Sequence, residues 1–159
     1  MPTVHITCGK ICSGKSYLAR ELREFNEDTE NAYQKAIILS VDDIMRIIIT
    51  ANGGCLGERH RAVERQVLEY ILERAIDIIA IIALNAAVII DHGFWYNDDR
   101  AYTQSYFKAR EISPIWHYCD EEYEIRKARL TERNKIAPEN AINPDKLRGF
   151  DQLFEDLDF

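Results

Sequence analysis

Apolar residues along the chain follow two alternating patterns, short continuous runs and longer segments with helical spacing. The short runs are rich in β-branched residues, which is typical of buried strands. The longer segments repeat apolar residues three and four positions apart, as on one face of a helix. The predicted strands lie within residues 3–8, 35–40, 86–90 and 112–118, and the predicted helices cover 16–25, 41–49, 57–84, 98–110, 120 or 121 through 134, and 144 to about 157.

Polar and glycine-containing segments separate these elements. Residues 26–34 and 135–143 predict loops, and Ala51–Gly54 predicts a break after the second helix. Asn85 suits the left-handed position that ends a helix, and Pro144 suits a helix start. Strands that alternate with helices predict an α/β fold, a doubly wound parallel sheet of four to five strands with helices on both faces. No fifth strand is visible in the pattern, and the length predicts a single domain over residues 1–159.

A phosphate-binding motif lies between the first predicted strand and the first predicted helix. Residues 9–16 match Gly-x-x-x-x-Gly-Lys-Ser, the loop that surrounds the phosphates of ATP or GTP. Its glycines allow backbone N–H groups to turn toward an anion, Lys15 reaches the β- and γ-phosphates, and Ser16 reaches Mg²⁺. The following helix directs its N-terminal N–H groups at the same place. The alternative is a glycine-rich turn without nucleotide. The predicted nucleotide-binding residues are Gly9, Lys10, Ile11, Cys12, Ser13, Gly14, Lys15, Ser16 and Tyr17.

Acidic residues follow the second and third predicted strands. Because ligands of open parallel sheets bind beyond the carboxyl ends of the strands, Asp42, Asp43 and Asp91 are candidate site residues. We expect Asp42 to be the general base and Asp91 to hold Mg²⁺ together with Ser16. One aspartate of the Asp42–Asp43 pair is expected to cap the next helix. His92 is a second candidate base, and Phe94, Trp95 and Tyr96 form either a substrate wall or part of the core.

Positive charge for the transferred phosphoryl group is available on the predicted helix before residue 135. Arg129 and Arg133 are four residues apart and therefore share one helical face. The alternative is a solvated helix face paired with Glu122, Glu124 and Glu132. The basic residues of this region are Arg126, Lys127, Arg129, Arg133 and Lys135.

Composition narrows the class of protein. The net charge of −7 disfavours a dedicated nucleic-acid binder. The apolar segment 71–90 contains Glu73, Arg74 and Asp77, which disfavours a membrane span. The first strand begins almost at the first residue, so we expect no signal peptide. The four cysteines lack zinc-site spacing, and a disulfide between Cys8 and Cys12 would distort the phosphate loop, so we expect a cytoplasmic protein.

The motifs together resemble small P-loop kinases of the AAA_33 type, whose relatives include polynucleotide 5′-hydroxyl kinase, chloramphenicol phosphotransferase and the zeta toxins. The resemblance implies ATP with Mg²⁺ as phosphoryl donor, Asp42 as base, and a lid at about 126–143 that brings Arg129 and Arg133 onto adenine and phosphates. It covers most of the chain. Its motifs are Gly9–Ser16, Ser40-x-Asp42-Asp43-Ile44, the segment Val88–Trp95, Arg100, and Arg129-x-x-x-Arg133-Asn134.

One departure from that family bears on the acceptor. Polynucleotide kinases place an arginine three residues after the first aspartate, where this chain has Met45 and then Arg46. We therefore expect a small-molecule hydroxyl acceptor, bound between the Asp42 segment, residues 51–60 and the turn at Phe94–Tyr96. A polynucleotide or nucleoside kinase, and a non-catalytic nucleotide switch or toxin component, are the alternatives.

Overall fold

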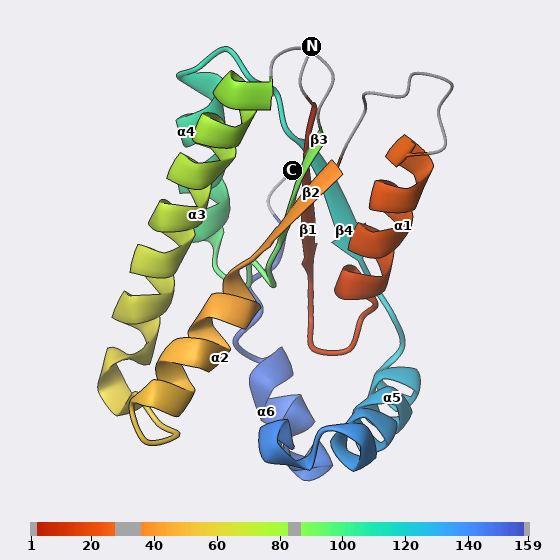
Figure 1. Cartoon of the computed structure of the whole chain (residues 1–159). Helices are drawn as coiled ribbons and strands as arrows, with labels where there is room; N and C mark the ends of the chain where they lie inside the picture. Colours follow the sequence, from red (N-terminus) through yellow and green to blue (C-terminus); the bar gives the residue numbers. More distant parts are fainter. Residues whose placement is uncertain (1–2, 28–35, 83–86, 158–159) are drawn as a thin grey trace.

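The protein is built around one parallel sheet, seen in a computed structural model that describes residues 3–27, 36–82 and 87–157 (Figure 1). The strands follow the order β2-β3-β1-β4, and each neighbouring pair is parallel. This topology confirms the predicted doubly wound α/β fold, with four strands among the described residues. The strands are β1 (Thr3–Gly9), β2 (Ala36–Ser40), β3 (Ala87–Asp91) and β4 (Ile115–Cys119).

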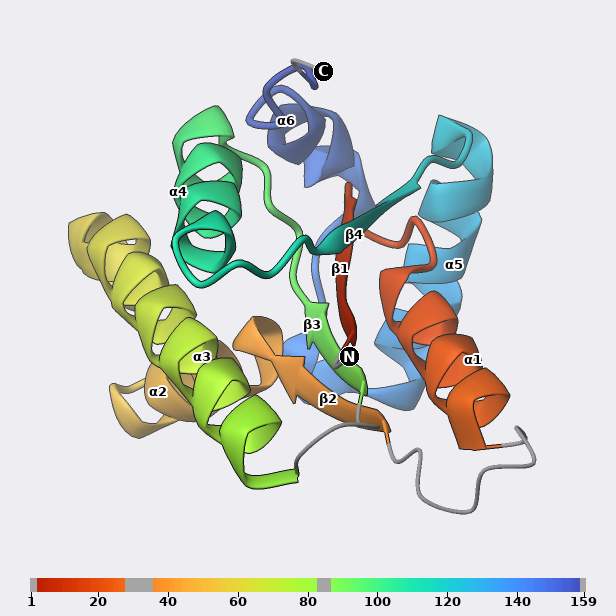
Figure 2. The ribbon, with the colours of Figure 1, turned by 90° about the horizontal axis from the view of Figure 1, so that it is seen from above.

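Helices cover both faces of this sheet, as predicted. Seen from above, α3 and α4 lie on one side of the strands and α1 lies on the other (Figure 2). Short 3₁₀ turns precede α3 and follow α5. The helices are α1 (Lys15–Glu27), α2 (Val41–Ala51), α3 (His60–Ile82), α4 (Asn97–Lys108), α5 (Tyr123–Ile136) and α6 (Leu147–Asp151).

The residues of β3 show why its sequence is continuously apolar. Val88 and Ile90 belong to the larger core cluster, which includes Leu68 and Phe107 from α3 and α4. Ala87 and Ile89 point the other way, toward Ala19 of α1. A strand with both faces covered has no solvent side, so it loses the polar alternation of a half-exposed strand.

Several predicted boundaries are wrong, and two of them have a clear physical reason. Strand β4 begins at Ile115 instead of residue 112, because Glu111 adopts a left-handed φ of 59° and Pro114 lacks a donor for the ladder. Helix α6 ends at Asp151, although we expected it to reach about residue 157. The segment after α6 is bound elsewhere, because the Glu155 N–H donates to the Trp95 carbonyl at 2.8 Å and Arg100 donates to the Glu155 carbonyl at 2.8 Å.

Helix α3 confirms the long predicted helix as far as the structure describes it. Its first predicted turn is a 3₁₀ turn over Gly57–Arg59, and the helix proper begins at His60. The predicted stop at Asn85 lies outside the described residues. Of the predicted loop at 26–34, residues 26 and 27 belong instead to α1, and the rest lies outside the described residues. Among the described helices, none combines the length and apolar character needed to cross a membrane.

The carboxyl ends of β1, β2 and β3 meet at one edge of the sheet. Asp91 lies in register with Thr7 of β1 and with Ser40 of β2. Helices α2, α5 and α6 lie beyond this edge, at the bottom of Figure 1. The predicted site residues therefore come together where an open parallel sheet binds its ligands.

Candidate active site

The loop between β1 and α1 has the backbone shape of an anion cradle. Cys12 and Gly14 adopt left-handed φ values of 57° and 95°, which turns successive peptide groups inward. Helix α1 begins at Lys15 and directs its free N–H groups into the loop. The Ser13 hydroxyl is buried and has no hydrogen-bond partner among the described residues. An anion with several acceptor oxygens fits this set of donors.

Gly9 is required by the close approach of two strands. A Cβ atom at Gly9 would lie 2.4 Å from the carbonyl oxygen of Cys119, which is far below a normal contact. The Gly9 N–H also donates to the Gly93 carbonyl at 3.0 Å, and the Trp95 indole donates to the Gly9 carbonyl at 3.2 Å. These contacts fix the start of the phosphate loop against the turn that follows β3.

Ser16 and Asp91 form the pair expected for Mg²⁺. The Ser16 hydroxyl donates to one carboxylate oxygen of Asp91 at 2.8 Å, and the Thr7 hydroxyl donates to the other at 2.9 Å. Asp91 is buried, so these two hydroxyls fix its orientation. A hydroxyl oxygen and a carboxylate oxygen are ligands that suit Mg²⁺ when nucleotide phosphates complete its coordination.

Lys15 lies between the phosphate loop and two carboxylates. Its ammonium donates to the Lys10 carbonyl at 2.7 Å. Burial lowers the pKa of Lys15, while the neighbouring Asp42 and Asp91 oppose that decrease. A bound phosphate would add negative charge around this ammonium and would further favour its charged form.

Asp42 lies at the start of α2 and faces His92 from the end of β3. Its carboxylate is 3.5 Å from the Nδ1 atom of His92, whose side chain is only 5% exposed. Within the described residues that Nδ1 atom has no hydrogen-bond partner. Ser40 caps α2 by accepting from the Asp43 N–H at 3.2 Å, and Asp43 pairs with Arg46 at the surface. The expected cap by one of the two aspartates is therefore wrong, because the preceding serine takes that position.

The pKa of Asp42 lies below its ordinary value. Desolvation by the surrounding protein raises this pKa, although 69% of the side chain is exposed. The hydrogen bond and positive charge of His92, together with the charges of Lys15 and Arg46, lower the pKa by more than desolvation raises it. The carboxylate is therefore ionised at neutral pH and able to accept a proton.

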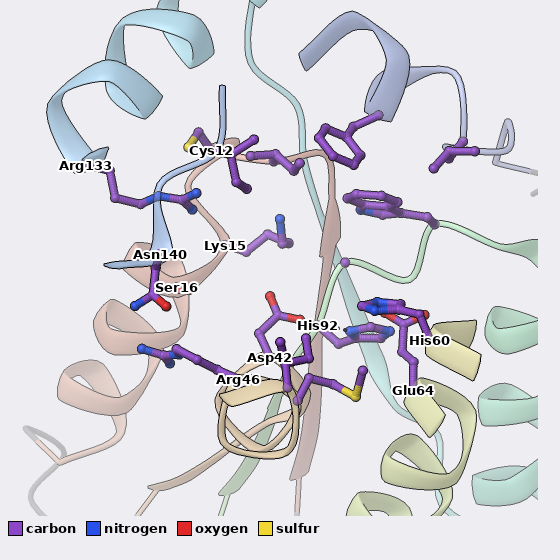
Figure 3. Close-up of a pocket in the computed structure, with 18 of the residues that line it drawn as sticks. Cys12, Lys15, Ser16, Asp42, Arg46, His60, Glu64, His92, Arg133 and Asn140 are labelled. Atoms are coloured by element: carbon purple, nitrogen blue, oxygen red, sulfur yellow. Dashed lines mark ion pairs between the residues drawn. The ribbon is translucent and has the colours of Figure 1, made fainter. Parts of the chain in front are cut away.

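A cavity of about 1200 Å³ joins the phosphate loop to Asp42. In Figure 3, Lys15, Asp42 and Arg133 point into the same space. Of the predicted site residues in the described chain, Gly9, Lys10 and Asp91 do not line this cavity, although each contacts a residue that does. The predicted residues that line it are Ile11, Cys12, Ser13, Gly14, Lys15, Ser16, Tyr17, Asp42, Arg129 and Arg133.

The basic residues of α5 lie in three environments, two of which are on the helix surface. Arg129 lies over the phosphate loop, where it donates to the Cys12 carbonyl at 3.3 Å and to Glu121 at 3.0 Å, and Arg133 lines the cavity. Lys127 and Lys135 pair instead with Asp145 at 3.8 Å and with Glu132 at 2.6 Å.

Arg126 is buried, which corrects its expected place beside the phosphates. It is 3% exposed and donates to both carboxylate oxygens of Asp151 at 2.8 and 2.6 Å, and to the Ile11 carbonyl at 3.3 Å. Arg126 therefore links the phosphate loop to α6. The sequence does not reveal this structural role, because it shows only a basic residue on a predicted helix.

Replacing Asp151 by alanine is expected to reduce the free energy of unfolding by about 3 kcal/mol, because the buried Arg126 guanidinium loses its counter-charge. Urea unfolding followed by circular dichroism measures the change. Asp145→Ala is the matched control, since Asp145 is 85% exposed and should change stability by less than about 0.5 kcal/mol. Equal effects of the two substitutions would contradict the role given to the buried pair.

The far side of the cavity was only partly predictable. Trp95 and Tyr96 line it, whereas Phe94 is fully buried in the core, so the core interpretation holds for Phe94 and the substrate wall stays a prediction for Trp95 and Tyr96. Glu64 and Asn140 line the cavity without having been singled out from the sequence. Glu64 lies within the periodic pattern of α3, where a charged residue is ordinarily a solvent-facing one, and no motif marks it.

Solved structures of two kinases and of Kti12 share this fold. A gluconokinase from Sinorhizobium meliloti superposes with a TM-score of 0.63, over 98% of this chain and 76% of that chain, at 16% identity. The APS kinase CysC of Mycobacterium tuberculosis, solved with AMPPNP and APS, gives a TM-score of 0.62 over 89% and 76%, at 15% identity. Kti12 of Chaetomium thermophilum, solved with ADP-AlF3, gives 0.68 over 96% and 80%, at 16% identity. The chain therefore has the fold of P-loop kinases.

No curated protein matches the chain at a significant level. A family profile does, over almost the whole length. The profile of the family AAA_33, described as an AAA domain, matches residues 4–155, which include the phosphate loop, Asp42, Asp91, Arg129 and Arg133. The chain belongs to the AAA_33 family, as its motifs implied.

Proposed function

We propose that the protein is an ATP-dependent phosphotransferase that moves the γ-phosphoryl group to a hydroxyl of a small molecule. One observation carries this proposal. The phosphate loop and the exposed carboxylate of Asp42 face a single cavity. Beyond Asp42, the wall of this cavity is formed by residues outside the loop, among them Gly57, Glu58 and Tyr96. A nucleotide switch needs the loop, but it has no need for an ionised carboxylate beside a second binding space.

The donor half of the cavity would hold MgATP. Backbone N–H groups of residues 11–16 and the Lys15 ammonium would bind the phosphates, and Ser16 with Asp91 would hold the metal, which the loop shape and the hydrogen bond between these two side chains support. Bound Mg²⁺ would supply charge neutralisation for the phosphates. Arg129 and Arg133 add positive charge from α5.

The acceptor half would place a hydroxyl at Asp42. The carboxylate accepts the hydroxyl proton as the acceptor oxygen forms its bond to the γ-phosphorus. The bond between that phosphorus and the β,γ-bridging oxygen breaks, and ADP leaves with the electron pair. Lys15, Arg129 and Arg133 offset the negative charge on the transferred group.

The size of the cavity supports two ligands. Pockets for a single small molecule are about 300–1,000 Å³, and this one reaches about 1200 Å³. Its lining extends from the phosphate loop to Gly57, Glu58 and Tyr96 on the far side.

We further propose that residues at about 126–143 act as the lid. Glu139, Asn140 and Ile142 line the cavity, and Asn134 fastens this segment to α5 through two hydrogen bonds with Ile142, at 2.7 and 3.1 Å. Because Arg126 is held by Asp151, closure of the lid over the cavity would involve the part of α5 that follows Arg126 in the sequence.

Replacing Asp91 by asparagine is expected to raise the Mg²⁺ concentration for half-maximal turnover by about 10- to 100-fold, because the partner of Ser16 loses its charge. A Mg²⁺ titration of the initial rate measures this shift. Asp77→Asn is the matched control, since Asp77 is an exposed partner of Arg74 on α3 and lies outside the cavity lining. An unchanged Mg²⁺ requirement for Asp91→Asn would refute the metal assignment.

The proposal is tested by ATP consumption against antibiotics, nucleosides, sugars and oligonucleotides, with the product phosphate located by mass spectrometry. We expect ADP formation to depend on a small hydroxyl compound. Preference for an oligonucleotide would favour the polynucleotide kinase alternative. MgATP binding without transfer to any compound would favour the switch or toxin component.

A further inference from the structure

The two halves of the cavity carry opposite charge. The donor half is lined by the three cations Lys15, Arg129 and Arg133 and by one carboxylate, that of Glu139, so it keeps an excess of positive charge. Beyond Asp42, the acceptor half is lined by the carboxylates of Glu58 and Glu64. This division matters because the triphosphate interacts with the cations of the donor half. An acceptor that binds beside Asp42 interacts instead with the carboxylates of the acceptor half.

The arginine of the acceptor half is already paired with carboxylates of the protein. Arg61 lines the cavity, but its guanidinium is 2.8 Å from Asp99, 3.0 Å from Asp98 and 3.6 Å from Glu64. The same guanidinium lies over the ring of Tyr96, 4.1 Å from its centre. An anionic acceptor would have to compete with three carboxylates for this one arginine.

The surrounding network has an excess of negative charge. Asp99 is 1% exposed and also accepts from Arg65 at 2.8 Å, while Arg65 pairs with Glu69 at 3.2 Å. Two guanidinium groups, those of Arg61 and Arg65, therefore face four carboxylates, those of Glu64, Glu69, Asp98 and Asp99. Glu58 adds a further carboxylate at the cavity wall.

Arg46 also lines the cavity, but its side chain points away from the acceptor half. Arg46 pairs with Asp43, and Figure 3 shows its side chain extending to the side opposite His60 and Glu64. His92, whose buried Nδ1 atom has no hydrogen-bond partner among the described residues, lies between Asp42 and that region in the same view. Met45 and Ile49 supply apolar surface to the lining.

We infer that the acceptor is an alcohol that also carries an ammonium group, an inference that rests on the proposed kinase function. The hydroxyl is placed at Asp42, and the ammonium is bound by Glu64 and Glu58. A half-buried carboxylate gains more from an ammonium than from a neutral hydroxyl, since charge-assisted hydrogen bonds are stronger than neutral ones. The same carboxylates disfavour phosphorylated, sulfated and carboxylated acceptors through like-charge repulsion.

The test compares hydroxyl compounds that share a scaffold and differ in charge. One set is ethanolamine, ethylene glycol and glycolate, a second is glucosamine, glucose and glucuronate, and kanamycin represents polyammonium alcohols. Transfer from γ-labelled ATP gives kcat/KM for each. We expect the ammonium members to exceed their neutral counterparts by about tenfold or more, as one charge-assisted contact provides, and the anionic members to be the poorest.

Glu64→Gln should remove this preference, raising KM for the ammonium compounds about tenfold and leaving kcat/KM for neutral compounds unchanged. Glu73→Gln is the matched control, because Glu73 lies on the same helix but outside the described cavity lining and outside the network around Arg61 and Arg65. Best turnover of a neutral or anionic compound, or a preference that survives Glu64→Gln, would overturn the acceptor class while leaving the kinase function intact. Transfer to none of the compounds, with MgATP bound, would overturn the kinase function itself.

Discussion

Lys15→Ala is expected to lower kcat of phosphotransfer by about 10³-fold, because in the proposed function this ammonium offsets the negative charge on the transferred group. The fold should survive, since burial already disfavours this ammonium and lowers its pKa. Initial rates of ADP formation measure the loss, and circular dichroism checks the fold.

Lys10→Ala provides the matched control for this prediction. Lys10 belongs to the same loop, but its ammonium lies 5.7 Å from the centre of the Phe154 ring, and its backbone carbonyl, which accepts from Lys15, is retained in the variant. We expect its kcat to stay within about threefold of the wild type, because Lys10 is only half-buried and does not line the cavity. Equal losses in the two variants would show that the loop needs positive charge in general, and full activity of Lys15→Ala would refute the phosphate-loop assignment.

Asp42→Asn is expected to lower kcat by about 10²–10⁴-fold, the usual contribution of a general base. The amide keeps the shape of the carboxylate but cannot accept the hydroxyl proton. The affinity for MgATP should change little, since Asp42 lies on the far side of Lys15 from the loop in Figure 3. Stopped-time assays give kcat, and titration with a fluorescent ATP analogue gives the affinity.

Asp43→Asn separates the base from its neighbour. Asp43 is adjacent in sequence and carries the same group, but its side chain is 66% exposed and pairs with Arg46. Its replacement should leave kcat within about twofold, because an exposed pair contributes little. A large loss in Asp43→Asn, or none in Asp42→Asn, would mean that the base is another group, with His92 as the next candidate.

Local sequence rules were sufficient for the donor half of the site. The glycines of residues 9–14, the position of Lys15 at the start of a helix, and the aspartates after two apolar strands are all set by short-range pattern and by parallel topology. The pairing of Ser16 with Asp91 follows from these rules, because strand ends that are adjacent in the sheet bring both residues to one edge.

The acceptor half depends on long-range packing that no local pattern records. Glu64 and Arg61 become cavity residues because α3 packs beside α2 and α4, which places its first turns opposite Asp42. Arg126 shows the same limit in reverse. Its place on a basic helix grouped it with Arg129 and Arg133, but the tertiary position of Asp151 on α6 makes it a buried structural residue.

The end of the chain illustrates a further limit. Residues 152–157 have helical character in the sequence, but Arg100 and the Trp95 carbonyl compete for their backbone groups. Such competition between a local helix and distant hydrogen-bond partners is decided by the whole fold.

The fate of the γ-phosphoryl group tests the proposed kinase function most directly. ATP labelled at the γ-phosphate is incubated with Mg²⁺, the protein and the best acceptor of the panel, and the products are separated and counted. The proposed function predicts label in an organic phosphate ester, formed in a one-to-one ratio with ADP and abolished in both Lys15→Ala and Asp42→Asn. Label found in inorganic phosphate alone, or ATP bound and left intact with every acceptor, would contradict it.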